Sequence, residues 1–210
     1  MACAICKTRR EKRHCPGVQG EICAICCGEE REETVACPLD CEYLHIAHHQ
    51  ESRENKDPAA MPNHDFRISK ATLEKNVELI MAMQLAVLVP ALERNAIDND
   101  VKEALAGLVR TYQTLDSGLY YDSRPGNPIA GAIFDAVRQR VTEIRQVENE
   151  RGVHKVLDSQ VLTVLVFLQQ MEYAFNNDRK RGRCFIDNLR TTMAGVVDQH
   201  EPDPSPLIVS

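Results

Sequence analysis

The chain has 210 residues, of which 43% are hydrophobic and 27% charged, and its formal net charge at pH 7 is −6. This composition is ordinary for a soluble globular protein of one or two domains, and the acidic balance argues against a surface that grips nucleic acid over its whole area. The most apolar stretch, residues 77–92, is interrupted by Glu78, Gln84 and Pro90, whereas a transmembrane helix needs about 20 apolar residues. No N-terminal apolar stretch is long enough for a signal peptide, so we expect a cytoplasmic protein with no membrane span.

The cysteines give the strongest signal in the sequence, because eight of the nine lie before residue 42. The tetrapeptide CAIC occurs at residues 3–6 and again at residues 23–26. Clustered cysteines in a reducing compartment indicate metal ligands more often than disulfides. A gap of two residues lets both sulfurs of a tight turn reach one ion at about 2.3 Å, as tetrahedral zinc requires. The spacing therefore predicts a first structural zinc site with the ligands Cys3, Cys6, Cys23 and Cys26.

The remaining N-terminal cysteines predict a second closed zinc site. A Cys-Pro step at residues 15–16 is repeated at residues 37–38. Adjacent side chains in extended or turn backbone point to different sides, so Cys26 and Cys27 are expected to serve different ions and to lock the two sites together. The predicted ligands of the second site are Cys15, Cys27, Cys37 and Cys41.

The residues after Cys37 resemble the start of a helix. Pro38 is expected in the first helical turn, which would place Cys37 and Cys41 one turn apart on one face. His45 extends that face by another turn and is a reserve ligand. The two later histidines are expected on an exposed helix surface; they are His48 and His49.

Other chemistries use the same residue types. A disulfide framework fits the even number of cysteines but not a reducing compartment. A thioredoxin-type redox pair would have one CxxC motif near a βαβ pattern rather than two in tandem. An iron–sulfur cluster uses the same thiolate ligands and stays open as an alternative to zinc. Eight thiolates around two ions leave no free coordination position, so the predicted zinc is structural rather than catalytic.

Three segments carry a resemblance to known proteins: CAIC followed by CPGVQGEICAICCGEEREETVACPLDCEYL, then YYDSRPGN at residues 120–127, and RGRCFIDNLR at residues 181–190. They resemble an uncharacterised bacterial protein family with an N-terminal zinc module, and this resemblance implies no particular activity. More distantly, two interleaved ions in one short segment resemble B-box, MYND and HIT-type fingers, which implies binding of a protein partner.

After the cysteines, the sequence predicts a mainly α protein. Residues 50–65 are polar, contain two prolines, and are interpreted as a helix tail followed by a linker. Apolar residues at three-to-four spacing then predict a five-helix bundle over residues 66–197. Its helices are expected at residues 68–95 with a kink or break at Pro90, 100–117, 128–151, 155–176 and 183–197.

The predicted fold is therefore a small N-terminal two-zinc cross-braced module of treble-clef or ribbon type, followed by a helical bundle. The module is expected to span residues 1–49 and the bundle residues 66–197. A tail with three prolines, residues 198–210, is expected to be flexible.

Two basic loops, residues 7–14 and 178–184, could contact phosphate groups. The alternative interpretation is solvated loop charge, because acidic residues lie near the first loop and aromatic residues for base stacking are few. The candidate nucleic-acid contacts are Arg9, Arg10, Lys12, Arg13, Arg179, Lys180, Arg181 and Arg183.

The loop at residues 118–127 is richer in polar and aromatic side chains than a connector needs. Packing of the tyrosines at the bundle edge, with pairing or capping by the charged residues, is the alternative to a pocket. The ninth cysteine, Cys184, is expected to be buried and inert. The candidate pocket residues are Tyr120, Tyr121, Asp122 and Arg124.

The sequence contains no Ser/His/Asp pattern, no phosphate-cradling glycine loop and no HExxH motif. We therefore expect a non-enzymatic zinc-binding adaptor whose surface binds a partner, most plausibly a protein. A nucleic-acid-binding regulator that uses the basic loops is the alternative, and an enzyme with a pocket near Tyr121 and Arg124 is the third reading.

Overall fold

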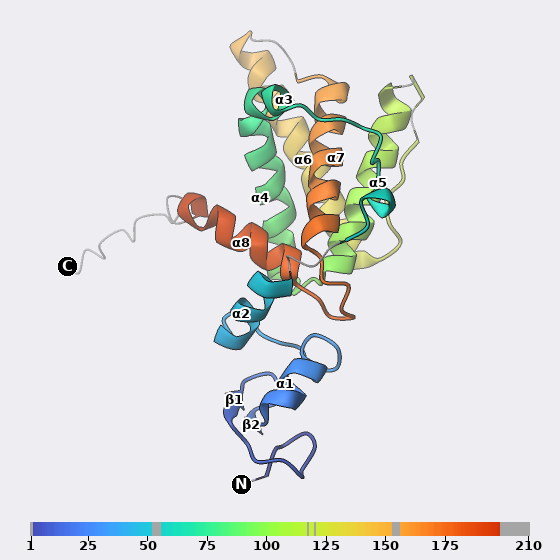
Figure 1. The fold of residues 1–210 in the computed structure, drawn as a ribbon. Helices are drawn as coiled ribbons and strands as arrows, with labels where there is room; N and C mark the ends of the chain where they lie inside the picture. The colour runs from blue at the N-terminus through green and yellow to red at the C-terminus, as the bar shows by residue number, and fades with distance from the viewer. Residues whose placement is uncertain (1, 52–55, 117, 120, 153–155, 198–210) are drawn as a thin grey trace, which may run out of the picture.

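The structure is a computed structural model that describes residues 2–51, 56–116, 118–119, 121–152 and 156–197. These residues form a mainly helical fold with a small two-stranded sheet near the N-terminus (Figure 1). The predicted flexible tail, residues 198–210, and the candidate pocket residue Tyr120 lie outside the described residues. No helix in the described ranges is both long and apolar enough to cross a membrane.

The cysteine-rich segment, residues 2–51, is built from one hairpin and two helices. Strand β1 (Arg13–Cys15) pairs antiparallel with β2 (Gly20–Ile22). Helix α1 (Ala24–Glu30) begins immediately beyond Cys23, and α2 (Glu42–Glu51) follows a loop. Three buried cysteines and one isoleucine form a small core that is separate from the main one. Cysteine side chains thus make up most of this small separate core.

In the helical part, residues 58–197, the described residues form one 3-10 turn and six α-helices. Helices α5 to α8 lie close to the predicted ranges. The elements are η1 (Pro58–Ala60), α3 (Lys70–Lys75), α4 (Val77–Glu93), α5 (Asp98–Asp116), α6 (Pro128–Arg151), α7 (Asp158–Phe175) and α8 (Cys184–Val197).

The first predicted helix is interrupted at Asn76 and not at Pro90. Ser69 caps α3 by accepting a hydrogen bond from the amide of Thr72 at 3.1 Å, and Asn76 leaves helical geometry before α4 begins. Pro90 lies in the last turn of α4, where its carbonyl still accepts from the Arg94 amide. A missing amide so near the end of a helix removes one backbone bond without ending the helix.

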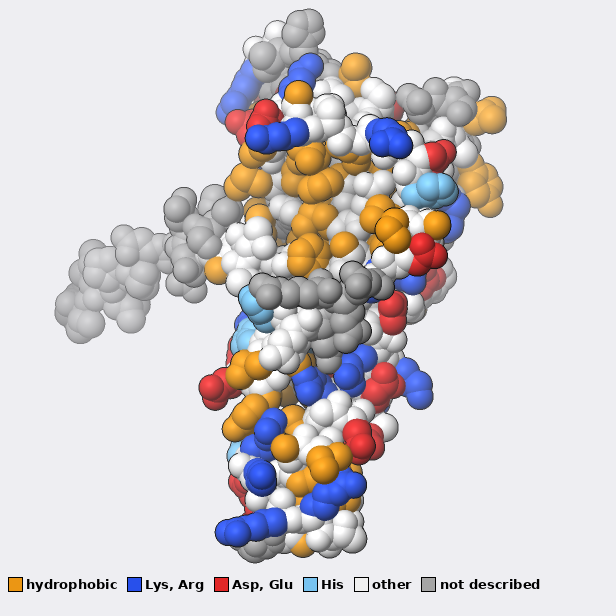
Figure 2. Space-filling model, viewed as in Figure 1, with side chains coloured by type: hydrophobic (Ala, Val, Ile, Leu, Met, Phe, Trp, Pro, Cys, Tyr) orange, Lys and Arg blue, Asp and Glu red, His pale blue; other side chains and the backbone are white. Residues whose placement is uncertain are grey.

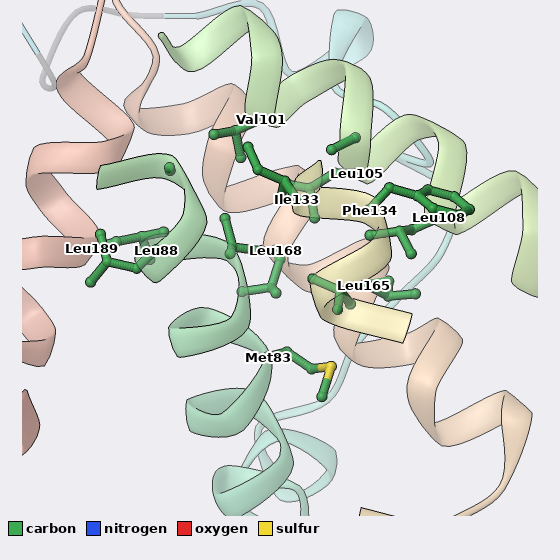
Figure 3. Packing of buried hydrophobic residues seen from close by; sticks show 14 of the residues in the cluster. Met83, Leu88, Val101, Leu105, Leu108, Ile133, Phe134, Leu165, Leu168 and Leu189 are labelled. Atoms are coloured by element: carbon green, nitrogen blue, oxygen red, sulfur yellow. The ribbon is translucent and has the colours of Figure 1, made fainter. Parts of the chain in front are cut away.

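The main core lies where α4, α5, α6 and α7 meet. Figure 3 shows Leu165 and Leu168 of α7 packed among side chains of α4, α5 and α6. Phe134 of α6 is fully buried, as is Met83 of α4. Apolar residues from all four helices therefore converge in one core.

The cysteine-rich segment lies at one end of the helical part (Figure 1). Leu39 and Leu44 of this segment are buried in the same core as Leu88 and Leu189. Burial of a leucine side chain contributes on the order of 2 kcal/mol. The two parts are therefore held together by apolar contact as well as by the polar contacts described next.

Glu32 is the centre of a buried polar junction between the two parts, and its exposed fraction is 0%. One carboxylate oxygen accepts from the backbone amide of Arg183 at 2.8 Å, and the other accepts from the side chain of Asn177 at 2.8 Å. The Glu32 carbonyl accepts from the amide of Arg181 at 2.7 Å. One glutamate thus fixes the loop of residues 176–183 that leads into α8.

His48 is buried at this junction, so its predicted place on an exposed surface was wrong. Its Nε2 lies 3.0 Å from a Glu32 oxygen and its Nδ1 lies 2.9 Å from a carboxylate oxygen of Asp187 in α8. The neighbouring His49 is exposed, as predicted. The two carboxylates explain the difference, because a charged imidazole can be buried only where it is paired.

Candidate metal centre

Four cysteine sulfurs of the first predicted set lie within 4.8 Å of one another: those of Cys3, Cys6, Cys23 and Cys26. Tetrahedral zinc with Zn–S bonds of about 2.3 Å would place its four sulfurs about 3.8 Å apart, so a small inward shift would close the set around one ion. All but Cys6 are buried. This cluster could bind a metal such as zinc.

Backbone amides are directed at these sulfurs. Cys23 is the N-cap of α1, and its sulfur accepts from the amide of Cys26 at 3.4 Å. The Cys3 sulfur accepts from the amide of Cys23 at 3.2 Å. The Lys7 amide donates to the Cys3 carbonyl, which closes the turn that carries Cys6. Amides that point at sulfur favour the thiolate, the form that binds metal.

The thiols of this cluster do not ionise equally. Hydrogen bonds from Thr8 and from the Arg9 backbone lower the pKa of Cys6 to about 5. The Cys26 amide lowers the pKa of Cys23, whose sulfur also accepts from the Arg9 guanidinium. Burial, together with hydrogen bonds to the neighbouring thiols, raises the pKa of Cys26 to about 12. Because the thiol of Cys26 loses its proton only beside a compensating positive charge, the four sulfurs suit a divalent cation.

The second predicted set lines one small cavity of about 20 Å³, whose walls include Cys15, Cys27, Cys37 and Cys41. Arg13 contributes to this cavity: its Nη1 lies 3.6 Å from the Cys27 sulfur, and its Cζ lies 3.9 Å from the centre of the Tyr43 ring. Burial raises the pKa of Cys37 to about 11. Within the part of the chain that the structure describes, the sulfurs of the first set alone are gathered closely enough to share an ion.

Cys26 and Cys27 face different sets from a helix rather than from extended backbone. Both belong to α1, in which consecutive residues are rotated by about 100° around the axis. Cys26 gathers with the first set, and Cys27 lines the second cavity. The backbone predicted for this pair was wrong, but helical rotation separates the two side chains as well as an extended chain would.

The helix predicted to begin at Cys37 begins at Glu42 instead. The amide of Cys41 donates to the Pro38 carbonyl at 3.1 Å and closes a separate turn, and α2 starts only beyond it. Pro38 is therefore not in the first helical turn. Because the turn folds back on itself, Cys37 and Cys41 still line the same cavity.

His45, the reserve ligand, has both ring nitrogens directed at α8 and not at the sulfurs. Its Nδ1 lies 3.1 Å from a carboxylate oxygen of Asp187, and its Nε2 lies 3.2 Å from an Arg190 nitrogen. His45 thus belongs to the polar junction with His48.

Several arginines of the predicted nucleic-acid loops have partners inside the protein. Arg9 bonds the Cys23 sulfur, Arg13 contacts Cys27 and Tyr43, and Arg179 donates to the Arg31 carbonyl at 2.8 Å. Figure 2 shows lysine and arginine side chains gathered over the cysteine-rich segment and its junction with the helical part. Of the candidate contacts, the exposed ones are Arg9, Arg10, Lys12, Lys180 and Arg181.

The loop after α5 is tied to α6 by two ion pairs. Arg124 donates to both carboxylate oxygens of Asp135, at 2.9 and 2.7 Å, and Arg138 donates to Asp122 at 2.7 Å. The Arg124 guanidinium covers Gly131 so closely that a β-carbon there would lie 2.8 Å from it. The sequence allowed two interpretations of this loop, a pocket or pairing of its charged residues, and these ion pairs agree with the second.

The buried charges of the junction were not predicted. Glu32 is one of four glutamates in a short run, and nothing in the sequence separates it from its neighbours. Asp187 lies in the segment RGRCFIDNLR, which carries part of the family resemblance. That resemblance was the signal in the sequence that could have drawn attention to Asp187. Cys184 of the same segment is buried as expected, and its sulfur donates to the His48 carbonyl at 3.8 Å.

No protein-family model, curated protein or solved structure matches this chain. The functional argument therefore depends on the site alone. That site is a buried four-sulfur cluster in a small hairpin-and-helix segment, which buried charges join to a set of helices.

Proposed function

We propose that residues 2–51 form a structural zinc module and that the protein acts as a non-enzymatic adaptor that presents a surface to a partner protein. The gathered sulfurs of the first set are the observation that carries this proposal. Four thiolates around one zinc leave no position for water or substrate, which is the coordination of structural zinc.

A second zinc ion would be held by the cavity that Cys15, Cys27, Cys37 and Cys41 line. A cavity of about 20 Å³ accommodates roughly one water-sized sphere, which suits a single ion. The positive charge of Arg13 beside Cys27 would offset part of the excess negative charge of four thiolates. Helix α1 would then connect the two ions through adjacent cysteines, so that each ion restrains the other.

Metal would stabilise more than the segment that binds it. The small separate core of the segment is mostly cysteine, so metal binding supplies folding free energy there that apolar burial does not. The ordered segment positions Glu32, which fixes the loop before α8, and His48, which contacts Asp187 in α8. A protein partner suits this arrangement because cross-braced fingers, which the cysteine pattern resembles, mainly bind proteins. A reducing cytoplasm would keep the thiols available for metal.

A nucleic-acid-binding regulator is the second candidate function. Its support is the exposure of Arg10, Lys12, Lys180 and Arg181 on two loops. Binding through such side chains would weaken steeply with added salt, because it releases counterions.

The test compares capture of proteins from a native lysate by the zinc-loaded chain, by Cys26→Ser and by Cys184→Ala. Cys184→Ala retains all eight predicted ligands and is the matched control. The proposal predicts proteins that wild type and Cys184→Ala retain and Cys26→Ser does not, with little effect of nuclease or moderate salt. Equal capture by Cys26→Ser contradicts it, and capture that nuclease abolishes supports the nucleic-acid alternative.

A further inference from the structure

An open groove of about 850 Å³ lies between the cysteine-rich segment and the helical part. Its volume is in the range of ligand-binding sites. Much of its lining is apolar, and Leu92 at the end of α4 is 39% exposed there. The apolar residues are contributed by both parts of the molecule and include Pro16, Pro38, Leu39, Leu92 and Ile97. The groove therefore exists only while the two parts are docked.

Positive charge exceeds negative charge along the groove. Arg181, Arg183 and Arg190 line it, and among the lining residues that the structure describes Asp40 is the one carboxylate. Arg190 donates to Asp40 at 2.8 Å, so these two charges offset each other. Arg181 and Arg183 have no carboxylate partner among the described residues that line the groove, so their charges can act on a ligand that enters it, although Asp98 and Glu32 also act on Arg183.

Arg183 is half-buried, and one of its side-chain donors lacks an acceptor within the described ranges. Its Nε is buried and has no hydrogen-bond partner among the residues that the structure describes. Burial lowers the pKa of Arg183, while Asp98 and Glu32 act on it by charge alone. A buried donor without an acceptor is costly, and a carboxylate that presents two oxygens is the natural partner of a guanidinium.

We propose that this groove binds an acidic, aliphatic segment of a partner protein, with a carboxylate that accepts from Arg183 and Arg181. Aliphatic side chains next to that carboxylate would cover Leu39, Leu92 and Ile97. This inference rests on the proposed adaptor function and specifies the chemistry of the partner. A peptide is favoured over nucleic acid because the described residues that line the groove include no aromatic side chain for base stacking.

The test uses the zinc-loaded full chain and fluorescence anisotropy with three labelled probes. The first is a short peptide in which aspartates alternate with leucine and glycine, the second is its twin with Asn for each Asp, and the third is a single-stranded oligonucleotide of equal charge. Arg183→Gln removes the proposed carboxylate donor, and Lys180→Gln is the control, because Lys180 is an exposed cation of the same loop that does not line the groove.

A second variant protects the test against misfolding of Arg183→Gln. Asn95 lines the groove at φ 53°, where Asn and Asp are both tolerated. Asn95→Asp is nearly isosteric and adds a negative charge that would repel an acidic peptide.

The proposal predicts that the acidic peptide binds at least about tenfold more tightly than its Asn twin, and that Arg183→Gln and Asn95→Asp each weaken it about tenfold while Lys180→Gln does not. Equal binding of the two peptides, preference for the oligonucleotide, or no binding up to about 1 mM would overturn it. Every form in this experiment is zinc-loaded, so a negative result concerns the groove alone. The proposed adaptor function is tested separately, by comparing protein capture by wild type and by Cys26→Ser.

Discussion

At the residue scale, His48 lies between two buried carboxylates that belong to different parts of the molecule. Although burial opposes the shift, hydrogen bonds to Asp187 and Glu32 raise the pKa of His48 to about 9. The pKa of Asp187 moves in the opposite direction: burial would raise it, but the bond from His48 and the nearby cations lower it. At neutral pH a charged imidazolium therefore joins the cysteine-rich segment to α8.

This charge predicts a pH-dependent contribution to stability. Since the pKa of His48 is raised from 6.5 to about 9 in the folded chain, its contribution is fully present below pH 6.5 and is lost as the pH rises through about 9. The shift corresponds to about 3 kcal/mol. Urea unfolding should show His48→Gln most destabilised near pH 6 and much closer to wild type above about pH 9. The exposed neighbour gives the control, His49→Gln, and a pH-independent difference would contradict the assignment.

The adjacent pair Cys26 and Cys27 gives a second prediction at this scale. Cys26→Ser should remove the ion of the first set, and Cys27→Ser should loosen the second ion with little effect on the first, because the two side chains face different sets. Native mass spectrometry during chelator titration measures both. Loss of both ions in either variant would show that the ligands are not divided in this way.

At the element scale, α8 is the clearest case of a helix whose start depends on a distant residue. One Asp98 carboxylate oxygen accepts from the amide of Phe185 at 2.9 Å, and the other accepts from the amide of Ile186 at 3.1 Å. Burial raises the pKa of Asp98 to about 7. Asp98 thus caps a helix from the beginning of α5, far earlier in the chain.

Asp98→Ala should lower the free energy of unfolding by about 2 kcal/mol, since it leaves two amides without an acceptor. Asp98→Asn retains one acceptor and should lose less. Thermal unfolding provides the measurement, with the exposed neighbour variant Asn99→Ala as the reference. An unchanged melting temperature in Asp98→Ala would mean that these amides find other acceptors.

Local patterns were sufficient to predict α5 to α8 and the first cysteine set, because helix stripes, caps and CxxC spacing act over a few residues. Asn127 caps α6 and Gly152 ends it at φ 65°, both as the sequence indicates. The sequence did not predict the partners of Glu32 and Asp98, nor the bonds between Asp187 and the two histidines His45 and His48. Their bonds join residues far apart in the chain, and one sequence contains no signal for such pairs.

At the scale of the whole molecule, the two parts share one core and one polar junction. Leu39 and Leu44 pack with residues of α4 and α8, and Glu32 fixes the loop before α8. Unfolding of the cysteine-rich segment would therefore leave Asp187 without its partner His48 and would expose apolar surface on the helices. The segment is thus expected to stabilise the helical part as well as itself.

Hydrogen exchange with and without chelator tests this coupling. Metal removal should speed exchange throughout residues 2–51 and also in residues 176–190, while α5 and α7, which pack on each other, stay protected. Unchanged exchange in residues 176–190 would show that the helical part does not depend on the metal-bound segment.

The most direct measurement is the metal content of protein purified without added metal or chelator, determined by native mass spectrometry. Structural zinc in both cysteine sets predicts two zinc ions per chain, released together with the loss of structure near the N-terminus. A metal-free chain that is fully folded there, or one whose N-terminal cysteines are joined as disulfides, would contradict it.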